Sequence, residues 1–487
     1  MLKVFLINPP IHNFLGDCRG NTTPLGLMYL AAVLEKAGYQ PKILDAESAM
    51  LNWEELTEKI KQENPDIIGI GGTSLGLPAL YKTVEICQRV APQAKIITGG
   101  SGTTFEPNKI LKNLPAVEVV VMGEGEKTIL ELMNYFEGKK NLKEIKGIAY
   151  RNNNEIVINQ PQEFIEDLNS LPLPAYHLLE PTFLAYTGTH HAEETYGIKT
   201  PNAVIMASRG CPHRCIFCSN GQVKNRRRDP QKVVDEIEFC LKLGAKSFQF
   251  YDDEFVGTNP TQNRWIEAIC DEIIKRKLNH IAYIVQGRCS PFVELKTLKK
   301  MKEAGFVWIW WGVESGSQKV LDRIKKDTTI KDIKNSFQLA KEAGIKSLMF
   351  IMVGLPGETE EDVLQTGKLI EEIKPDQVRF HITTPFPGSA IWEELKVKNQ
   401  IEDYDFLHYN TRGKAVHHTD TMSAAKIEEA FRLLVWRYES KKINFVKMFF
   451  RSFLSFKEFK KLPTRIRKVL VFVPRWLKIK LMPSPST

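Results

Sequence analysis

The first 126 residues alternate short apolar runs with stretches in which apolar residues recur at helical spacing. The apolar runs are Lys3–Asn8, Pro41–Asp45, Ile67–Gly71, Lys95–Thr98 and Val117–Met122. Helical spacing is clearest at residues 25–37 and 79–90, which lie between these runs. Such alternation is typical of a parallel sheet covered by helices on both faces. The pattern therefore predicts an α/β fold that begins with a doubly wound, Rossmann-like domain at residues 1–140.

The same alternation resumes after residue 200 with six further apolar runs. They are Ala203–Met206, Lys246–Tyr251, Ile281–Val285, Val307–Val313, Ser347–Val353 and Gln377–His381. Six β/α units predict a partial (β/α)6 barrel at residues 201–395, with its active site at the carboxyl ends of the strands. Residues 141–200 show turn chemistry without strong periodicity and are predicted to be a linker. Residues 396–487 are predicted to form a helical C-terminal region.

Composition places the chain among ordinary globular proteins. Its 487 residues are 43% hydrophobic and 26% charged, which allows two or three domains. No apolar run reaches the roughly 18 residues of a spanning helix. Eight cysteines without a secretory leader favour a reducing compartment, and we expect the cytoplasm. Positive charge gathers at the end of the chain, because residues 441–487 contain 13 Lys or Arg against the single acid Glu458.

Three cysteines, Cys211, Cys215 and Cys218, are spaced as C-x3-C-x2-C. Soft thiolate ligands select iron–sulfur clusters, zinc or copper. A cubane of four irons needs four ligands, so three cysteines would leave one iron open to a small molecule. The spacing alone also allows three reduced thiols, or a zinc site whose fourth ligand lies elsewhere.

This spacing, with Phe217 just before the third cysteine, resembles the radical S-adenosylmethionine (SAM) enzymes. In that family the open iron is chelated by SAM, and an electron from the [4Fe-4S] cluster cleaves SAM to a 5′-deoxyadenosyl radical. The resemblance implies that the three cysteines hold the cluster and that polar groups at the strand ends hold SAM. The residues it assigns to SAM are Phe217, Asp252, Asp253, Arg288, Glu314, Ser315, Gly354 and Pro356.

The chemistry of these residues suits SAM, although each also has a structural interpretation. Carboxylates at Asp252 and Asp253 can accept hydrogen bonds from a cationic amine. The alternative is a helix-capping Asp followed by solvated acids, which fits Glu254 better than Asp252. Arg288 could pair with a carboxylate through two hydrogen bonds, or serve a structural role. A buried Glu314 needs a partner, which favours a ligand or a salt bridge.

The first domain, placed directly before the cysteine motif, resembles the cobalamin-binding domain of one large class of radical SAM proteins. Glycine-rich turns after successive strands would let a large flat ligand approach the backbone. The expected contacts are Pro10, Thr73, Ser74, Gly99, Gly100, Gly123, Glu124 and Gly125. Each turn could instead be merely a tight turn. The D-x-H-x-x-G motif, whose histidine binds cobalt in mutases, is absent, and the nearest histidine, His12, has the wrong spacing and is expected to be solvated. We therefore expect cobalt without a histidine from the protein.

The resemblance therefore implies methylation of an sp3 carbon, with methylcobalamin as the methyl donor. Relatives with the same layout instead close rings or rearrange carbon skeletons, so cyclisation stays open. A hypothesis from another class is a non-catalytic sensor that uses bound cobalamin and an iron–sulfur cluster. The enzyme hypothesis implies a small-molecule substrate and an electron donor such as flavodoxin or ferredoxin.

The basic tail offers the one substrate clue. Between Ile443 and Leu481, aromatic and aliphatic residues are interleaved with Lys and Arg, as in amphipathic helices that lie on an anionic membrane. A lipid or isoprenoid substrate would then be sensible, as in the hopanoid methylases that this layout resembles. Packing of these aromatics on the barrel is an equal alternative. A nucleic-acid partner is not expected, because so many bulky apolar residues need burial.

Overall fold

The computed structural model describes residues 2–15, 22–153, 155–182, 185–186, 196–221 and 223–442. The described residues divide into two units, one that ends at Phe431 and one that begins at Arg432. Helix α16 (Ala424–Lys442) is the last described element. The basic segment 443–487 lies outside the described residues, so its amphipathic character stays a prediction.

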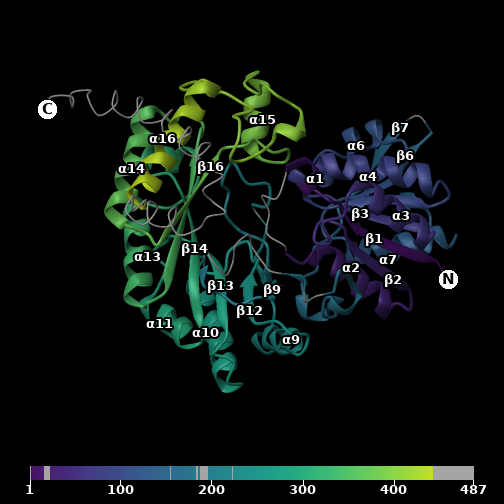
Figure 1. Ribbon diagram of the computed structural model, residues 1–487, viewed down its shortest axis with the longest axis horizontal. Helices are drawn as coiled ribbons and strands as arrows, with labels where there is room; N and C mark the ends of the chain where they lie inside the picture. The colour runs from purple at the N-terminus through teal and green to yellow at the C-terminus, as the bar shows by residue number, and fades with distance from the viewer. Residues whose placement is uncertain are drawn as a thin grey trace, which may run out of the picture. The chain divides into compact units, whose positions relative to one another are not determined.

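The N-terminal half of the chain contains an eight-stranded sheet, whose strand order is β7-β6-β5-β4-β3-β1-β2-β8 (Figure 1). Its five central strands are parallel, so their carboxyl ends meet at one edge. These strands are β1 (Lys3–Asn8), β2 (Gln40–Asp45), β3 (Ile67–Gly71), β4 (Lys95–Gly99) and β5 (Val117–Val121). All five coincide with the predicted apolar runs to within a residue or two.

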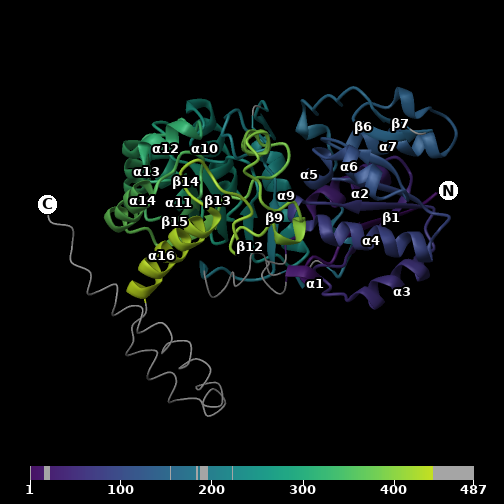
Figure 2. The same ribbon diagram turned by 90° about the horizontal axis from the view of Figure 1, so that it is seen from above.

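Helices cover both faces of this sheet. Figure 2 shows α2 and α7 on one side of β1, and α3 and α4 on the other. The helices of this half are α1 (His12–Leu15), α2 (Leu25–Lys36), α3 (Trp53–Glu63), α4 (Leu77–Val90), α5 (Ser101–Thr104), α6 (Pro107–Asn113) and α7 (Glu126–Phe136). Burial on both faces is why the strand sequences are continuously apolar. The doubly wound α/β fold predicted for this half is confirmed.

Three further strands lie in the range that was predicted to be a linker. The hairpin of β6 (Ile148–Asn152) and β7 (Glu155–Ile158) extends the sheet antiparallel to β5, and β8 (Leu179–Glu180) pairs with β2. Strand β7 is at the edge and is exposed or half-buried throughout, and β8 has two residues. Strands of this kind lack the apolar run that marks a central strand, and β6 ends in the polar residues Arg151 and Asn152, so the sequence pattern did not show the three strands. The limits of the domains stay a prediction.

A second sheet has six parallel strands in the order β16-β15-β14-β13-β12-β9. The strands are β9 (Asn202–Ile205), β12 (Ser247–Phe250), β13 (Ala282–Arg288), β14 (Phe306–Glu314), β15 (Lys346–Val353) and β16 (Gln377–Ile382). The helices are α9 (Pro230–Lys242), α10 (Pro260–Lys275), α11 (Leu295–Glu303), α12 (Gln318–Arg323), α13 (Ile330–Glu342), α14 (Glu360–Ile373) and α15 (Ala390–Val397). Because spatial order follows chain order and the first and last strands do not pair, the sheet is an open, partial barrel, as predicted.

Strand β14 shows the two faces of this second sheet. Trp311 packs against Phe337 of α13, with ring centroids 6.1 Å apart. Its neighbour Trp310 points the other way and packs with Tyr196 and Phe350. Since side chains alternate along a strand, the face with Trp310 is the one that the helices leave uncovered.

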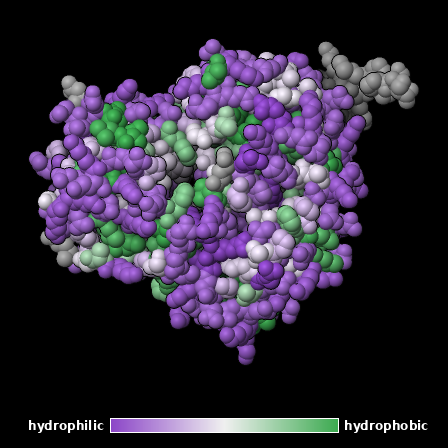
Figure 3. All heavy atoms as spheres, turned by 180° about the vertical axis from the view of Figure 1, so that it is seen from behind, coloured by the Kyte–Doolittle hydropathy of each residue, from purple (hydrophilic) through white to green (hydrophobic). Residues whose placement is uncertain are grey.

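One face of the molecule, seen in Figure 3, is mainly hydrophilic. On the face shown in Figure 3, apolar side chains form small separate groups. Within the described ranges, we find no helix with both the length and the apolar character needed to cross a membrane.

Candidate active site

The three cysteines lie on a hairpin-shaped segment, residues 207–228, which we call the cysteine loop. Its base is closed by the antiparallel pair β10 (Ser208–Arg209) and β11 (Arg226–Arg227). Gly210 has φ +93°, and a Cβ there would lie 2.5 Å from the carbonyl oxygen of Lys224. Glycine is therefore required where the chain turns into the cysteine motif.

The three thiols are free of disulfide bonds. Cys211 and Cys215 are half-buried and Cys218 is exposed. Burial raises the pKa of Cys211 to about 12, and the nearby carboxylates of Glu254 and Asp253 add to this effect. A thiolate at this position needs compensating positive charge.

Two buried cations lie beside the loop and can supply that charge. Arg288 Nη1 donates to Cys215 Sγ at 3.6 Å, whereas its Nε and Nη2 are buried without a partner. Lys326 Nζ lies 2.9 Å from Glu314 Oε1 and 5.7 Å from the centroid of the Phe217 ring. Burial alone would lower the pKa of Lys326, but the charges of Glu314 and Cys215 hold it above its ordinary value, so the side chain stays protonated. The sequence did not point to Lys326, which looks like any lysine between two helices.

Asp252 and Asp253 fasten the cysteine loop to the end of β12. The buried Asp252 accepts hydrogen bonds from Ser208 Oγ and from the backbone N–H of Ala207, and burial raises its pKa to about 7. Asp253 accepts from Gly210 N at 3.0 Å and from Asn220 Nδ2 at 3.4 Å. Their carboxylates are therefore occupied by the loop, and their contact with SAM stays a prediction.

Glu254 is buried, which contradicts the alternative that it is a solvated acid. Its Oε2 lies 3.1 Å from His213 Nε2 and 3.8 Å from Cys211 Sγ. Its Oε1 is buried without a hydrogen-bond partner. The sequence could not show this, because three successive acids after a strand do not reveal which of them turn inward. Glu254 is thus a buried acceptor, directly beside the cysteine loop, that has an oxygen to spare.

The remaining residues assigned to SAM fall into two groups. Phe217, Arg288 and Glu314 meet around Cys215 and Lys326, as described above. Ser315 instead contacts α14, with its Oγ 3.4 Å from Thr366 Oγ1. Gly354 and the buried Pro356 form the turn after β15, where Gly354 has φ +89° and a Cβ would lie 2.8 Å from Ile427 of α16. These three residues stay predicted SAM contacts.

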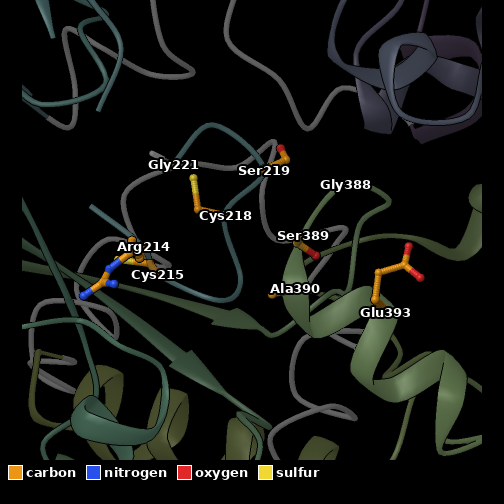
Figure 4. Close-up of a pocket in the computed structure, with 9 residues that line it drawn as sticks. All are labelled: Arg214, Cys215, Cys218, Ser219, Gly221, Gly388, Ser389, Ala390 and Glu393. Atoms are coloured by element: carbon orange, nitrogen blue, oxygen red, sulfur yellow. The ribbon is translucent and has the colours of Figure 1, made fainter. Parts of the chain in front are cut away.

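A pocket of about 280 Å³ borders the cysteine loop. Its lining residues are Arg214, Cys215, Cys218, Ser219, Gly221, Gly388, Ser389, Ala390 and Glu393 (Figure 4). Figure 4 shows Cys218 and Arg214 on the loop side, with Ser389 and Glu393 of the α15 end across from them. A small ligand therefore has room next to two of the three thiols.

The residues present fit the cofactors that the motif implies. Three free thiols on one loop, with two buried cations beside them, suit a cluster whose thiolates carry negative charge. The two unpartnered N–H groups of Arg288 suit a carboxylate such as that of SAM. Across the ranges that the structure describes, no three Cys, His, Asp or Glu side chains are grouped as ligands of a single metal ion.

The predicted cobalamin turns meet at the carboxyl edge of the first sheet. Gly72 N donates to Gly99 O at 2.8 Å, and Gly102 N donates to Gly72 O at 2.9 Å. Gly100 has φ +104°, and a Cβ there would lie 2.6 Å from Gly72 O. The turns after β3 and β4 therefore pack backbone to backbone, which only glycines allow. Close by, Thr98 Oγ1 at the end of β4 is buried without a partner, which fits a polar ligand at this edge.

The other predicted cobalamin contacts have different surroundings. Pro10 is buried, Thr73 Oγ1 accepts from Gly76 N at 3.1 Å, and Ser74 begins a short 3-10 helix. Gly123 has open space where a Cβ would stand, whereas Gly125 has Leu30 at 3.1 Å.

Glu124 is occupied by partners within the protein. Its carboxylate accepts from Arg226 Nη1 at 3.0 Å, from Arg226 Nη2 at 2.9 Å and from Ile165 N at 2.8 Å. Burial alone would raise its pKa, but these bonds and the charge of Arg209 hold the pKa below its ordinary value. Glu124 is therefore an ionised anchor for the cysteine loop.

Comparison with known proteins agrees with this geometry. The radical SAM superfamily matches residues 205–370, and the B12 binding domain family matches residues 13–133. The chain belongs to the radical SAM superfamily, in the branch with an N-terminal B12-binding domain, and is a radical SAM enzyme.

Its relatives include an uncharacterized methyltransferase of Pyrococcus horikoshii, 30% identical over 84% of this chain and 87% of the relative. An anaerobic magnesium-protoporphyrin IX monomethyl ester cyclase of Rubrivivax gelatinosus is 33% identical over 84% of this chain and 72% of the cyclase. Among solved structures, the radical SAM methyltransferase TsrM from Kitasatospora setae matches with a TM-score of 0.67 at 20% identity. That match covers 82% of this chain and 76% of TsrM, and it supports the fold.

Proposed function

We propose that this protein is a cobalamin-dependent C-methyltransferase, which moves a methyl group from methylcobalamin to an sp3 carbon of a small-molecule substrate. The observation that carries the proposal is the placement of three free thiols on one loop, which has Arg288 beside Cys215 and Lys326 beside Phe217 and is ion-paired to a turn of the B12-binding domain. When bound, the cluster and SAM supply a carbon-centred radical, and cobalamin supplies the methyl group. The methyltransferase relative from P. horikoshii supports this reaction class.

The chain's own residues would bind and orient the cofactors. Cys211, Cys215 and Cys218 would hold the cluster. Arg288 has two free N–H groups that could bind the carboxylate of SAM. Glu254 has a free buried oxygen that could accept from the amino group of SAM. Lys326 would supply a positive charge beside the cysteine loop, next to Phe217.

The glycine-rich edge of the first sheet would hold cobalamin. Gly99, Gly100 and Gly123 expose backbone there, with Thr73 and its neighbours alongside. Cobalt would have no histidine ligand from His12. That side chain is half-buried rather than solvated as expected, and its Nδ1 lies 2.9 Å from Glu47 Oε2.

A lipid or isoprenoid substrate, an electron donor such as flavodoxin or ferredoxin, and contact of residues 441–487 with an anionic membrane belong to the same proposal. The basic and apolar sequence of that segment supports them, together with Leu433 and Trp436 of α16, which are 40% and 41% exposed.

A second candidate is radical cyclisation or rearrangement. The cyclase of R. gelatinosus, which is 33% identical, favours this alternative. The residues that bind the cofactors would be shared, so product analysis must decide between the two reactions.

The experiment is anaerobic reconstitution with iron, sulfide, cobalamin and SAM, followed by addition of a reductant and a membrane-lipid extract. Methyl transfer predicts 5′-deoxyadenosine and S-adenosylhomocysteine together, both dependent on cobalamin. Deoxyadenosine alone would favour cyclisation, and neither product from a protein with an intact cluster would contradict both reactions. Cys215→Ala should abolish both products, whereas Cys270→Ala, at a buried thiol in α10, should retain them.

A further inference from the structure

Four charged side chains join the cysteine loop to the turn after β5, and we call them the clamp: Glu124, Glu126, Arg209 and Arg226. Arg226 makes two hydrogen bonds to Glu124, at 2.9 and 3.0 Å. Arg209 Nη2 donates to Glu126 Oε1 at 2.6 Å, and Arg209 Nη1 lies 3.4 Å from Glu124 Oε1. None of the four side chains is more than 15% exposed, so water competes little for these bonds.

Aromatic rings and backbone groups hold the two arginines in place. The Arg209 guanidinium lies 4.9 Å from the ring of Tyr29 in α2, and that of Arg226 lies 4.8 Å from the ring of Phe164. Arg226 Nη1 also donates to Ile165 O at 2.9 Å. A planar guanidinium with paired hydrogen bonds and a stacked ring has few alternative positions. The clamp is therefore a stiff connection.

The clamp acts on both ends of the cysteine loop. Arg209 belongs to β10 and stands two residues before Cys211, while Arg226 belongs to β11 at the return of the loop. The two acids of the clamp, Glu124 and Glu126, flank Gly125. They follow Gly123, which is a predicted cobalamin contact. A ligand that fixes this turn would therefore also fix the base of the cysteine loop.

We propose that Arg209 and Arg226 are positioning residues that couple cobalamin binding to assembly of the cluster. The inference rests on the two cofactor sites of the proposed function, but not on methyl transfer. Because coupling between two binding sites is reciprocal, a loop held by its cluster also holds the cobalamin turn in its binding arrangement.

The test is an anaerobic equilibrium titration of the full chain with hydroxocobalamin, followed by absorbance, with and without the assembled cluster. We expect the Kd for cobalamin to be at least fivefold lower in the cluster-loaded protein. In Arg226→Met this ratio should fall to about one, while the protein still binds cobalamin.

The matched control is Lys224→Met. Lys224 lies in the same loop and pairs with Glu166 at 2.9 Å, but the two side chains are 77% and 67% exposed. An exposed pair of this kind contributes little, so the control should keep the wild-type ratio.

If Arg226→Met does not fold, Arg209→Lys tests the coupling instead. This variant keeps the positive charge but loses the paired N–H groups of the guanidinium. A reduced ratio in this variant supports the coupling. Hydrogen exchange of residues 207–228 gives a second readout. Hydroxocobalamin should slow exchange of these residues in the wild type and not in Arg209→Lys. A ratio of one in the wild type, or an unchanged ratio in the folded clamp variants, would overturn the inference. Since neither SAM nor substrate is present, failure of the methyltransferase assignment would leave this result untouched.

Discussion

Replacement of Lys326 by Met tests the charge pair beside the cysteine loop. The Lys326 and Glu314 side chains are only 7% and 10% exposed, so the variant leaves a carboxylate in a site that water barely reaches. Removal of one partner from a buried pair costs about 3–5 kcal/mol. The double variant Lys326→Met/Glu314→Gln removes both charges and should recover about 0.5–3 kcal/mol of that loss.

Urea unfolding of the protein without cofactors, followed by tryptophan fluorescence, measures these free energies. The signal is suitable because Trp308, Trp310 and Trp311 lie in β14, the strand that ends in Glu314. Lys334→Met is the control, since Lys334 pairs with Glu372 on the surface and should matter by less than about 0.5 kcal/mol. If Lys326→Met is no less stable than Lys334→Met, or if the double variant recovers nothing, the description of a buried, coupled pair is refuted.

Further outcomes follow from other parts of the structure. Burial raises the pKa of Glu358 to about 8, so the folded state retains a proton that the unfolded state loses near pH 4.5, and stability should fall as pH rises between these values. Glu358→Gln should flatten this part of a Tm against pH profile, and equal slopes for the two proteins would contradict the assignment. Gly354→Ala should destabilise by about 1–3 kcal/mol, because φ is +89° and the new Cβ meets Ile427. Gly38→Ala, at φ +91° in open space, should cost less in the same thermal unfolding experiment, and the reverse order would argue against the Ile427 contact. Each of Cys211→Ala, Cys215→Ala and Cys218→Ala should lose most of the iron bound after reconstitution, whereas Cys270→Ala should bind as much as the wild type; equal iron in all four would exclude the cysteine loop as the cluster site.

Much of the fold could be predicted because its central strands are buried on both faces. Strands such as β1 and β14 are continuous apolar runs, and helices separate them in the sequence. Among the strands that were missed, β7 lies at an edge of the sheet and β8 has two residues, while β6 ends in the polar residues Arg151 and Asn152, so each leaves a weaker apolar pattern.

The site could be predicted only in part, because its polar contacts join residues far apart in the sequence. The cysteine spacing identified the loop, since its three thiols are close along the chain. Arg226 and Glu124 are 102 positions apart, and nothing local marks them as partners. Likewise, the burial of Glu254 and the pairing of Lys326 with Glu314 depend on how the ends of the strands pack, which no local sequence pattern shows.

The most direct measurement of the central claim follows the methyl group itself. The reconstituted protein is given SAM labelled with deuterium in its methyl group, a reductant and the lipid extract, with and without cobalamin. Methyl transfer predicts a labelled methyl group in a product that forms only with cobalamin, in step with equal amounts of 5′-deoxyadenosine and S-adenosylhomocysteine. A cobalamin-dependent product without the label would contradict the account.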